Sequence, residues 1–371
     1  MSKGTFVQSR LQRAVDAVHA TGATGVLARV STAGGSTAAR AGVADLGSGR
    51  PVPWGAYHRI GSITKTFTAT VALQLVGEGE FGLDDTVEER LPGVVRGNGN
   101  DGRKITVRDL LRQTSGLNDY DEHLPWVRRF TPAKFREERF RAYRPEELIA
   151  LAMKNPPQWV PDPGDPAAGT RWGYSNTNYL LVDMIIEKVT GNSTAQEIND
   201  RVIEPLGLHH TLLAGTSPHV PRPRATGYTR FPGHEELTDT SVFTPFPDAP
   251  LISTTSDVTS FFRALMSGRL LRPAQLTQMK DTVEARDKWT TEPGARYGLG
   301  VYWRPAEGCA EGIWYHGGTM PGYISQAGVT ADGSRAAATS ATTWRPGDQQ
   351  GQDAQDRATV KLIDRALCRI G

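Results

Sequence analysis

The sequence predicts a mixed α/β fold, in which an antiparallel sheet built from both ends of the chain is flanked by helices and carries an inserted, mainly helical lobe. Two observations predict this fold. Strand patterns occur near both ends of the chain, and helical spacing of apolar residues dominates the middle and returns at the very end. We therefore expect a discontinuous α/β lobe from residues 1–82 and 285–371, a helical lobe from residues 83–284, and a site in the cleft between them.

The elements follow in this order. Two strands, Thr24–Val30 and Ala38–Asp45, flank a turn rich in Gly and Ser and form a hairpin. A helix covers Ser62–Glu78, because its apolar residues recur at helical spacing and glycines mark its end. Three further helices lie in the middle of the chain, at Val107–Gln113, Pro145–Met153 and Asn178–Thr190. The last part carries strands at Gly298–Trp303, Gly312–Tyr315, Tyr323–Val329 and Arg335–Thr343 and ends in a helix over Gln352–Leu367.

The composition is that of a globular enzyme without a strong charge bias. Of the 371 residues 38% are hydrophobic, and 42 basic against 40 acidic residues leave a net charge of +2. This balance provides no general attraction to nucleic acid or to an anionic membrane, so we expect neither as a partner. Arginines and aromatic residues alternate over Arg128–Arg144, but glutamates lie among them, which favours a solvated amphipathic helix or lid.

Targeting and redox signals are sparse. No run of about eighteen apolar residues is present that could span a bilayer. Charged residues at Arg10, Arg13 and Asp16 interrupt the region where a secretory signal would be apolar, so we expect a cytoplasmic protein as written, or a secreted one if a signal was trimmed. Cys309 and Cys368 lie far apart and lack metal-ligand spacing, which leaves two inert thiols or one disulfide.

The first candidate for chemistry is the tetrad Ser62-Ile63-Thr64-Lys65 at the start of a predicted helix. Residues three apart lie on one helix face, so the lysine amine can reach the serine hydroxyl. A serine needs a base to become a nucleophile, and a desolvated lysine can help as that base. The pattern by itself is expected about once in a chain of this length, and a serine helix cap followed by a surface lysine is the alternative explanation.

A second candidate is the sequence Tyr174-Ser175-Asn176, directly before a predicted helix. The Tyr174 phenol could carry the serine proton to a leaving group, while Asn176 could bind a substrate amide and orient the lysine. Alone, the three residues also fit ordinary loop and helix-cap chemistry.

A third candidate is His316-Gly317-Gly318-Thr319, at the end of a predicted strand. The two glycines remove side chains and would let the backbone approach a ligand closely. The backbone N–H groups of Thr319 and Ser62 could then form an oxyanion hole. A hairpin bend with a buried histidine is the alternative. The three patterns in this order, on a helix, in the helical lobe and on a late strand, indicate one shared site.

With these motifs the chain resembles the soluble serine DD-carboxypeptidases and class C β-lactamases of the penicillin-recognising superfamily, and most of all the secreted D-Ala-D-Ala carboxypeptidases. The resemblance runs nearly end to end, through RIGSITKTFTATVALQLVGEG, ITVRDLLRQTSGL, WGYSNTNYLLVDMIIEKVTG, ISTTSDVTSFFRALMSG, YGLGV and YHGGTMPGY. It implies a β-lactamase/DD-peptidase-like fold and a covalent acyl-serine intermediate.

The resemblance also implies a role for each motif residue. The expected roles are nucleophile for Ser62, proton transfer for Lys65 and Tyr174, positioning for Asn176, a place beside the site for His316, and a disulfide between Cys309 and Cys368. No metal or other cofactor is expected, since the eight histidines include no H-x-H or H-x-x-x-H pattern.

Two departures from the family concern the substrate. The K-T-G or H-T-G box of the family is His-Gly-Gly at 316–318 here, which removes a threonine hydroxyl that helps to hold a substrate carboxylate. After YGLG the carboxypeptidases place an arginine that grips the terminal carboxylate, whereas this chain has Tyr302 and Trp303, with Arg304 displaced. A lost charge-assisted anchor costs about 1.5 to 3 kcal/mol, which argues against a free-carboxylate peptide as the native substrate.

The sequence thus predicts a serine hydrolase or acyltransferase that takes a small-molecule or peptide amide or ester and passes the acyl group to an amine acceptor in antibiotic-type biosynthesis. Trp126 and Tyr302 could line an aromatic substrate pocket. The alternatives are a D-Ala-D-Ala carboxypeptidase or transpeptidase, an esterase, and a slowly acylated penicillin-binding sensor. The complete set of Ser62, Lys65 and Tyr174 favours an enzyme, and we expect a monomer.

Overall fold

The centre of the computed structural model, which describes residues 3–124, 130–162, 169–248, 251–286 and 292–368, is an eight-stranded antiparallel sheet. Its strands, in spatial order, are β10 (Val283–Glu284), β11 (Arg296–Tyr297), β12 (Tyr302–Ala306), β13 (Cys309–Met320), β14 (Tyr323–Thr330), β15 (Arg335–Ala341), β1 (Gly25–Thr32) and β2 (Gly35–Gly42). Strand β1 pairs with β15, from Val26 opposite Ala341 to Thr32 opposite Arg335. The sheet therefore joins both parts of the chain, as predicted, and the predicted mixed α/β fold is confirmed.

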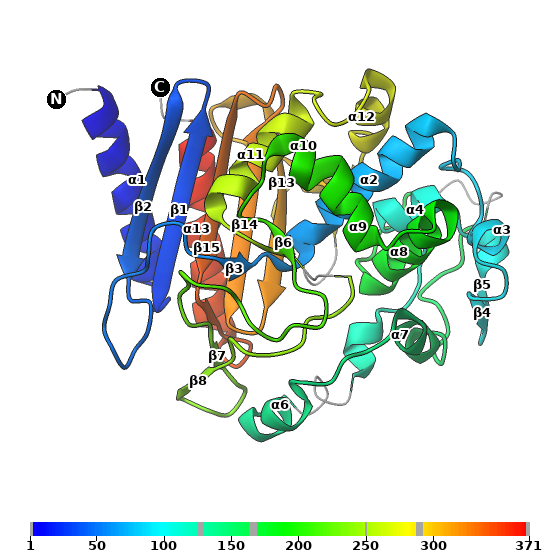
Figure 1. Ribbon diagram of the computed structural model, residues 1–371, viewed down its shortest axis with the longest axis horizontal. Helices are drawn as coiled ribbons and strands as arrows, with labels where there is room; N and C mark the ends of the chain where they lie inside the picture. Colours follow the sequence, from blue (N-terminus) through cyan, green and yellow to red (C-terminus); the bar gives the residue numbers. More distant parts are fainter. Residues whose placement is uncertain (1–2, 125–129, 163–168, 249–250, 287–291, 369–371) are drawn as a thin grey trace.

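Helices cover both faces of this sheet. Helix α11 (Thr255–Met266) packs against β1, β14 and β15, while α13 (Gln349–Cys368) packs against β14 and β15 and also contacts α1 (Lys3–His19). Figure 1 shows α11 in front of the strands and α13 behind them. Because both faces are covered, β15 is buried over nearly its whole length and consists largely of small apolar residues.

The helix that carries the candidate lysine lies at the junction of the sheet and the remaining helices. Helix α2 (Thr64–Glu78) contacts α8, α9 and α12, and most of its side chains are buried. A helix surrounded in this way has no polar stripe, so its sequence TKTFTATVALQLVGE is apolar or small nearly all round. Gly79 ends it in the left-handed conformation.

The other helices are α3 (Val87–Arg90), α4 (Val107–Arg112), α6 (Pro132–Glu138), α7 (Pro145–Ala152), α8 (Asn176–Thr190), α9 (Thr194–Ile198), α10 (Glu204–Leu206) and α12 (Pro273–Met279). In Figure 1, α3, α4, α7 and α8 lie on the side of α2 away from β1 and β2, whereas α10 lies beside α11 and α6 lies at the bottom of the view. Shorter turns are η1 (Gly61–Ile63), η2 (Gly102–Lys104), η3 (Tyr120–His123) and η4 (Asn199–Ile203). The division into lobes at residues 82 and 285 stays a prediction.

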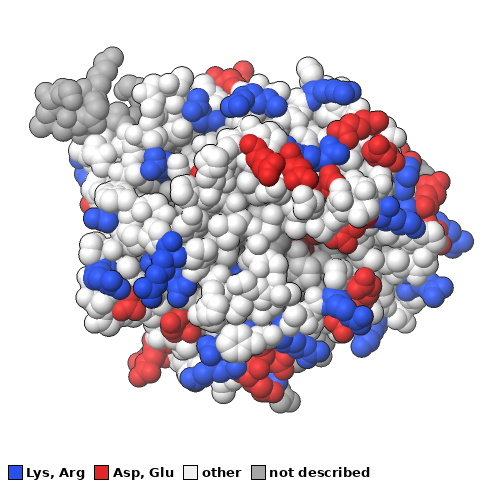
Figure 2. Space-filling view, in the orientation of Figure 1, with Lys and Arg blue, Asp and Glu red and all other residues white. Residues whose placement is uncertain are grey.

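Three small sheets complete the described structure. They are β16 (Thr343–Trp344) with β7 (Tyr228–Arg230) and β8 (Leu237–Asp239), β3 (His58–Arg59) with β9 (Leu251–Ser253) and β6 (Leu212–Leu213), and β4 (Arg96–Gly97) with β5 (Asn100–Asp101). Within the described ranges, no helix combines the length and the apolar character needed to cross a membrane. Charges of both signs are intermingled around the face shown in Figure 2, as the small net charge leads one to expect, while the centre of this face is mostly uncharged.

One predicted strand is wrong. Residues Gly298–Trp303 do not form a continuous strand, because β11 ends at Tyr297 and β12 begins at Tyr302, with a turn between them. Gly300 in this turn has a φ of +81°, which favours glycine, and its carbonyl oxygen accepts a 2.7 Å hydrogen bond from the Thr66 hydroxyl of α2. The YGLG segment is therefore a turn that packs against the lysine-bearing helix. Helices α1 and α11 were not predicted from periodicity.

Candidate active site

Ser62 lies in the turn that leads from the end of β3 into α2. The turn η1 spans Gly61–Ile63, and α2 begins directly after it at Thr64. Ser62 is partly exposed, whereas its neighbours Gly61 and Ile63 are buried. The positive end of the α2 dipole therefore lies beside an accessible hydroxyl, which favours negative charge at this position.

Lys65, one turn into the same helical segment, points back to Ser62. Its Nζ atom lies 3.4 Å from the Ser62 Oγ atom and donates to it. The side chain is fully buried and forms a 2.9 Å ion pair with Asp248 Oδ2. The second oxygen of Asp248 accepts a 2.5 Å hydrogen bond from the Tyr120 hydroxyl. Lys65 is thus held between the serine and a buried carboxylate.

The charge state of Lys65 follows from these neighbours. Burial is the largest single effect and lowers the pKa of Lys65, but the surrounding groups together, with Asp248 first among them, outweigh burial and raise the pKa above its ordinary value. Lys65 is therefore an ammonium group at neutral pH. Neither Asp248 nor its hydrogen bond with Tyr120 was predicted from the sequence, and Pro247-Asp248-Ala249-Pro250 carries no recognisable motif.

Tyr174 reaches the same pair from the segment before α8. The Nζ atom of Lys65 lies 5.5 Å from the centre of the Tyr174 ring. Burial raises the pKa of the Tyr174 phenol, and the Lys65 charge and the Ser62 hydroxyl oppose only part of this rise. The phenol is therefore protonated at neutral pH, next to both Ser62 and Lys65. The structure brings these three predicted residues together.

Asn176 is the first residue of α8 and lies at the border of the site. Its Nδ2 atom donates a 3.1 Å hydrogen bond to Asp119 Oδ2. Burial, more than any other effect, raises the pKa of Asp119, and the charge of Asp248 adds to the rise while Lys65 opposes it. The Asn176 amide is thus tied to an acidic neighbour of Lys65, and its role in orienting the lysine stays a prediction.

The end of β13 supplies the opposite wall. A Cβ atom on Gly318 would lie 1.9 Å from the Ile60 carbonyl oxygen and 3.0 Å from the Ser62 nitrogen, so only glycine permits this approach. A Cβ atom on Gly61 would lie 3.0 Å from the Thr319 nitrogen. The backbone nitrogens of Ser62 and Thr319 therefore come close to one another, as an oxyanion hole requires.

Gly317 differs from Gly318 in its surroundings. A Cβ atom at Gly317 would meet only the Ser325 carbonyl oxygen, at 3.7 Å. The fold therefore leaves room for a Cβ atom at residue 317, so the packing at this atom does not require glycine. In the described structure, β12 pairs with β13 no further than Tyr302 opposite Tyr315, so β12 makes no ladder pair with residues 316–319.

His316 is buried and neutral. Its Nδ1 atom lies 2.7 Å from the Gly317 carbonyl oxygen, and its Nε2 atom lies 3.3 Å from the Tyr297 hydroxyl. Burial lowers the pKa of His316 to about 3. The imidazole therefore brings no positive charge to the site. The Tyr302 ring belongs to a buried aromatic cluster. Its centre lies 5.1 Å from the centre of the Tyr315 ring, on which it stacks, and 5.2 Å from the centre of the His316 ring.

The remaining predicted residues lie elsewhere. Arg304 is buried and forms a 2.6 Å ion pair with Asp364 of α13, so it does not replace the missing carboxylate anchor. A disulfide joins Cys309, at the start of β13, to Cys368, at the end of α13. Trp126 lies outside the described residues. In the described part of the chain, no group of three His, Cys, Asp or Glu side chains could hold a metal ion.

Comparisons with known proteins agree with this architecture. The sequence model of the family described as Beta-lactamase matches residues 11–361. The structure of a D-stereospecific amidohydrolase from a Streptomyces species is 38% identical, with a TM-score of 0.82, and the match covers 93% of this chain and 97% of that one. D-amino acid amidase from Ochrobactrum anthropi SV3 shares the fold at 23% identity, with a TM-score of 0.77 and coverage of 96% of this chain and 99% of that chain.

Among curated proteins, penicillin-binding protein 4* of Bacillus subtilis (strain 168) is 27% identical over 76% of this chain. The chain spans only 60% of the length of that relative, and 40% of the length of penicillin-binding protein 4 of Amycolatopsis lactamdurans, which is 30% identical over 46% of this chain.

Proposed function

Because the chain belongs to the beta-lactamase family of serine hydrolases, we propose that it cleaves amides or esters through an acyl group bound to Ser62. The observation that carries the proposal is the 3.4 Å contact of Lys65 Nζ with a partly exposed Ser62 hydroxyl, beside the closely approaching Ser62 and Thr319 nitrogens. The family membership and the fold match the resemblance predicted from the motifs.

The proposed reaction has two steps. The Ser62 oxygen attacks the carbonyl carbon of the donor, and its proton passes through the Lys65–Tyr174 pair to the leaving nitrogen or oxygen. The N–H groups of Ser62 and Thr319 bind the negative oxygen that forms in between. Water or an amine then attacks the acyl-serine ester and returns a proton to Ser62. In the first step the Ser62 ester forms as the donor's C–N or C–O bond breaks, and in the second step the bond to water or the amine forms as the Ser62 ester breaks.

The charges around Lys65 support a donor that carries an ammonium group. Asp119, Asp121 and Asp248 are all close enough to influence one another and Lys65. Burial raises the pKa of Asp121 to about 8 and that of Asp119 to about 6, so a nearby cation would favour the ionised form of both groups. A positive group near these carboxylates would be favoured. We propose aminoacyl amides and esters as the donor class, and the 38% identical neighbour, named as a D-stereospecific amidohydrolase, supports the D configuration.

The absence of a carboxylate anchor supports the same donor class. Arg304 is occupied by Asp364, His316 is neutral, and residue 317 has no hydroxyl. A peptide that ends in a free carboxylate would therefore find no anchor for that carboxylate at any of these three positions. We propose that the acyl group passes to water and, where an amine acceptor is supplied, to that amine, as in small-molecule biosynthesis.

The test uses a panel of acyl donors and the intact protein. D- and L-aminoacyl amides and methyl esters, their N-acetylated forms and D-alanyl-D-alanine are each incubated with the protein, with and without an added amine. We expect turnover of the D-aminoacyl donors, an acyl mass on the wild type and none on Ser62→Ala. Turnover of D-alanyl-D-alanine alone would replace the proposal by a carboxypeptidase activity, and a stable penicillin adduct without turnover of any donor would replace it by a sensor.

A further inference from the structure

We propose that a pocket beside the first turns of α2 binds a small organic cation, an amine with an apolar body, at the carboxyl group of Asp183. The proposal goes beyond acylation at Ser62 and does not depend on it. Neither Ser62 nor Lys65 nor Tyr174 lines this pocket, so it is separate from the site described above. Its wall consists of α2, α8, the start of α9 and the segments 142–145, 213–216 and 244–247.

The size and the lining of the pocket suit an organic molecule. It encloses about 300 Å³, which is far more than one water needs and lies at the lower end of the range of small-molecule sites. Met184, Ile198 and Leu213 contribute aliphatic side chains to the wall, and Pro245 and Pro247 contribute their rings. Because burial of apolar surface is favourable, this wall favours a ligand with an apolar body.

Two buried polar atoms of the lining residues have no hydrogen-bond partner in the described part of the chain. They are the Oδ1 atom of Asp183 on α8 and the Oγ1 atom of Thr64 on α2. Buried polar atoms are nearly always hydrogen-bonded, because a buried atom without a partner has lost its contact with water and gained nothing in return. A ligand that carries several N–H donors at one end would provide partners for both atoms.

The charges around Asp183 favour a cation as this ligand. Asp183 and Glu187 lie one turn apart on α8, and both line the pocket. Burial raises the pKa of Asp183 well above its ordinary value, and the negative charges of Asp248 and Glu187 add to the rise, while Lys65 opposes it. An ammonium group in the pocket would oppose the rise as Lys65 does. The cation and the Asp183 carboxylate would therefore stabilise each other.

The positive side chains nearby have acidic partners of their own. Lys65, which acts on Asp183 from α2, lies 2.9 Å from Asp248, and Arg144, which lines the pocket, lies 3.4 Å from Glu147. A metal ion is not the expected occupant, because within the described ranges no group of three His, Cys, Asp or Glu side chains could hold one. An ammonium group needs only a few acceptor atoms, and its apolar body fits the rest of the wall.

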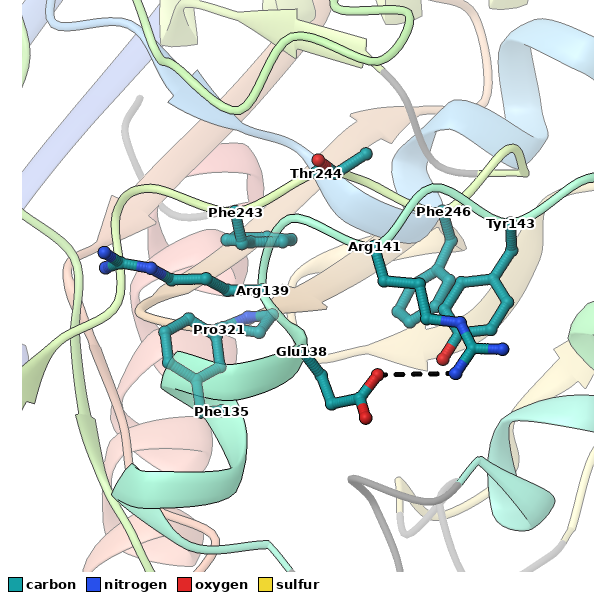
Figure 3. Close-up of a pocket in the computed structure, with 9 residues that line it drawn as sticks. All are labelled: Phe135, Glu138, Arg139, Arg141, Tyr143, Phe243, Thr244, Phe246 and Pro321. Carbon is teal, nitrogen blue, oxygen red and sulfur yellow. Dashed lines mark hydrogen bonds and ion pairs between the residues drawn. The ribbon is translucent and has the colours of Figure 1, made fainter.

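Part of the pocket wall is held in place by packing between two loops. Figure 3 shows Phe246 against Tyr143 and the 243–246 segment beside the 138–143 segment. The centres of these two rings lie 6.0 Å apart, and the rings are nearly parallel. The backbone nitrogen of Thr244 donates a 2.7 Å hydrogen bond to the Arg139 carbonyl oxygen. The pocket is therefore formed in the absence of a ligand, which lowers the cost of binding.

Isothermal titration calorimetry with phenethylamine tests the proposal, and phenethyl alcohol serves as a neutral molecule of nearly the same shape. We expect the wild type to bind the amine and to bind the alcohol at least about ten-fold more weakly. Asp183→Asn keeps the size of the side chain and removes its charge, so it should weaken binding of the amine about ten- to hundred-fold. The matched control Asp200→Asn removes an exposed carboxylate outside the pocket and should bind the amine as the wild type does.

Methionine labelled with carbon-13 in its methyl group shows where the amine binds. Met184 lines the pocket, so its resonance, assigned with Met184→Leu, should shift as the amine is added. Met279 is buried outside the pocket and should not respond. Ala195→Phe places a ring into the pocket from a partly exposed position on α9 and should abolish binding of the amine. This variant keeps the test decisive if Asp183→Asn fails to fold.

The proposal is overturned if the wild type binds no amine, which would leave the pocket to water. It is also overturned if the alcohol binds as well as the amine, or if Asp183→Asn leaves the affinity unchanged. Loss of binding in Asp121→Asn but not in Asp183→Asn would place the amine in the acidic group near Lys65 instead. None of these measurements requires an acyl group on Ser62, so failure of the proposed function is read separately.

Discussion

At the scale of single residues, the charge state of Lys65 depends on its buried ion pair with Asp248. Ser62, Lys65 and Tyr174 were all predicted from local patterns, because their spacing and helix position are written in short stretches of sequence. Asp248 could not be predicted in this way, since it lies 183 residues from Lys65 and follows a loop without periodic signal. It nevertheless favours the charged form of the lysine, because an opposite charge within hydrogen-bond distance stabilises a buried ammonium group. A short sequence motif cannot predict an ion pair between residues this far apart in the chain.

Tyr174 and Tyr179 allow the role of the phenol to be isolated. Both rings face Lys65 at nearly the same distance, 5.5 and 5.6 Å, but the Tyr179 hydroxyl donates to the Leu111 carbonyl oxygen at 3.0 Å. We expect Tyr174→Phe to slow acylation of Ser62 by about 10² to 10⁴-fold, the usual contribution of a positioned proton carrier. Stopped-flow measurement with a chromogenic ester reads this rate.

The matched variant Tyr179→Phe should retain most of the acylation rate. Its main cost is a free energy of unfolding lower by about 1 kcal/mol, because one buried hydrogen bond is lost. Equal losses of rate in both variants would show that the two rings act only by packing around Lys65, and the role of Tyr174 as proton carrier would then be abandoned.

At the level of elements, the site depends on close contact of three backbone segments. The turn η1, the end of β13 and the turn after β11 all approach α2 or its entrance, and glycines stand at the points of contact. The sequence predicted α2 and the middle of β13, at Gly312–Tyr315, but the YGLG segment was predicted as part of a strand. Its β-like run of apolar and aromatic residues does not reveal that Gly300 must turn beneath the helix, because that requirement comes from tertiary packing.

Gly300 provides the test at this scale. A Cβ atom there would lie 2.3 Å from the Ala69 Cβ atom and 3.2 Å from the Lys65 carbonyl oxygen. We expect Gly300→Ala to displace the first turns of α2, to lower the free energy of unfolding by about 2 to 4 kcal/mol through overpacking and backbone strain, and to slow acylation. Urea unfolding and the acyl mass on Ser62 measure the two effects.

Gly79→Ala serves as its control on the same helix. Gly79 has a comparable φ of +84°, but a Cβ atom there meets no atom within 4 Å. Only the backbone cost of about 1 kcal/mol should remain, with normal acylation. If both variants lose stability equally and both acylate normally, the contact of the turn with α2 does not position the lysine.

On the scale of the whole molecule, the sheet that joins residues 25–42 to residues 283–341 explains why the fold could be predicted. Strand patterns at both ends and helical patterns between them leave few arrangements that bury all apolar faces, and the resemblance to a known family selected one. The lengths of β10 and β11 and the presence of α1 were beyond reach, because the ends of short strands and the amphipathic character of a polar helix give weak local signals. Ion pairs between residues far apart in the sequence, such as Arg304 with Asp364, could not be predicted either.

The disulfide between Cys309 and Cys368 joins the start of β13, an inner strand of the central sheet, to the end of the closing helix α13, and it provides the final prediction. The two residues are 59 apart in sequence, and closing a loop of this length restricts the unfolded chain by about 4 kcal/mol in the chain-entropy description. The double variant Cys309→Ser, Cys368→Ser should therefore unfold at lower urea concentration, with a free energy of unfolding reduced by up to this amount. Because α13 lies behind the sheet while Ser62 lies at the entrance of α2, acylation of the folded variant should be unchanged.

Adding a thiol reductant should lower the free energy of unfolding of the wild type toward that of the variant and leave the variant itself unaffected. A reductant effect of equal size on both proteins would mean that the pair contributes nothing to stability.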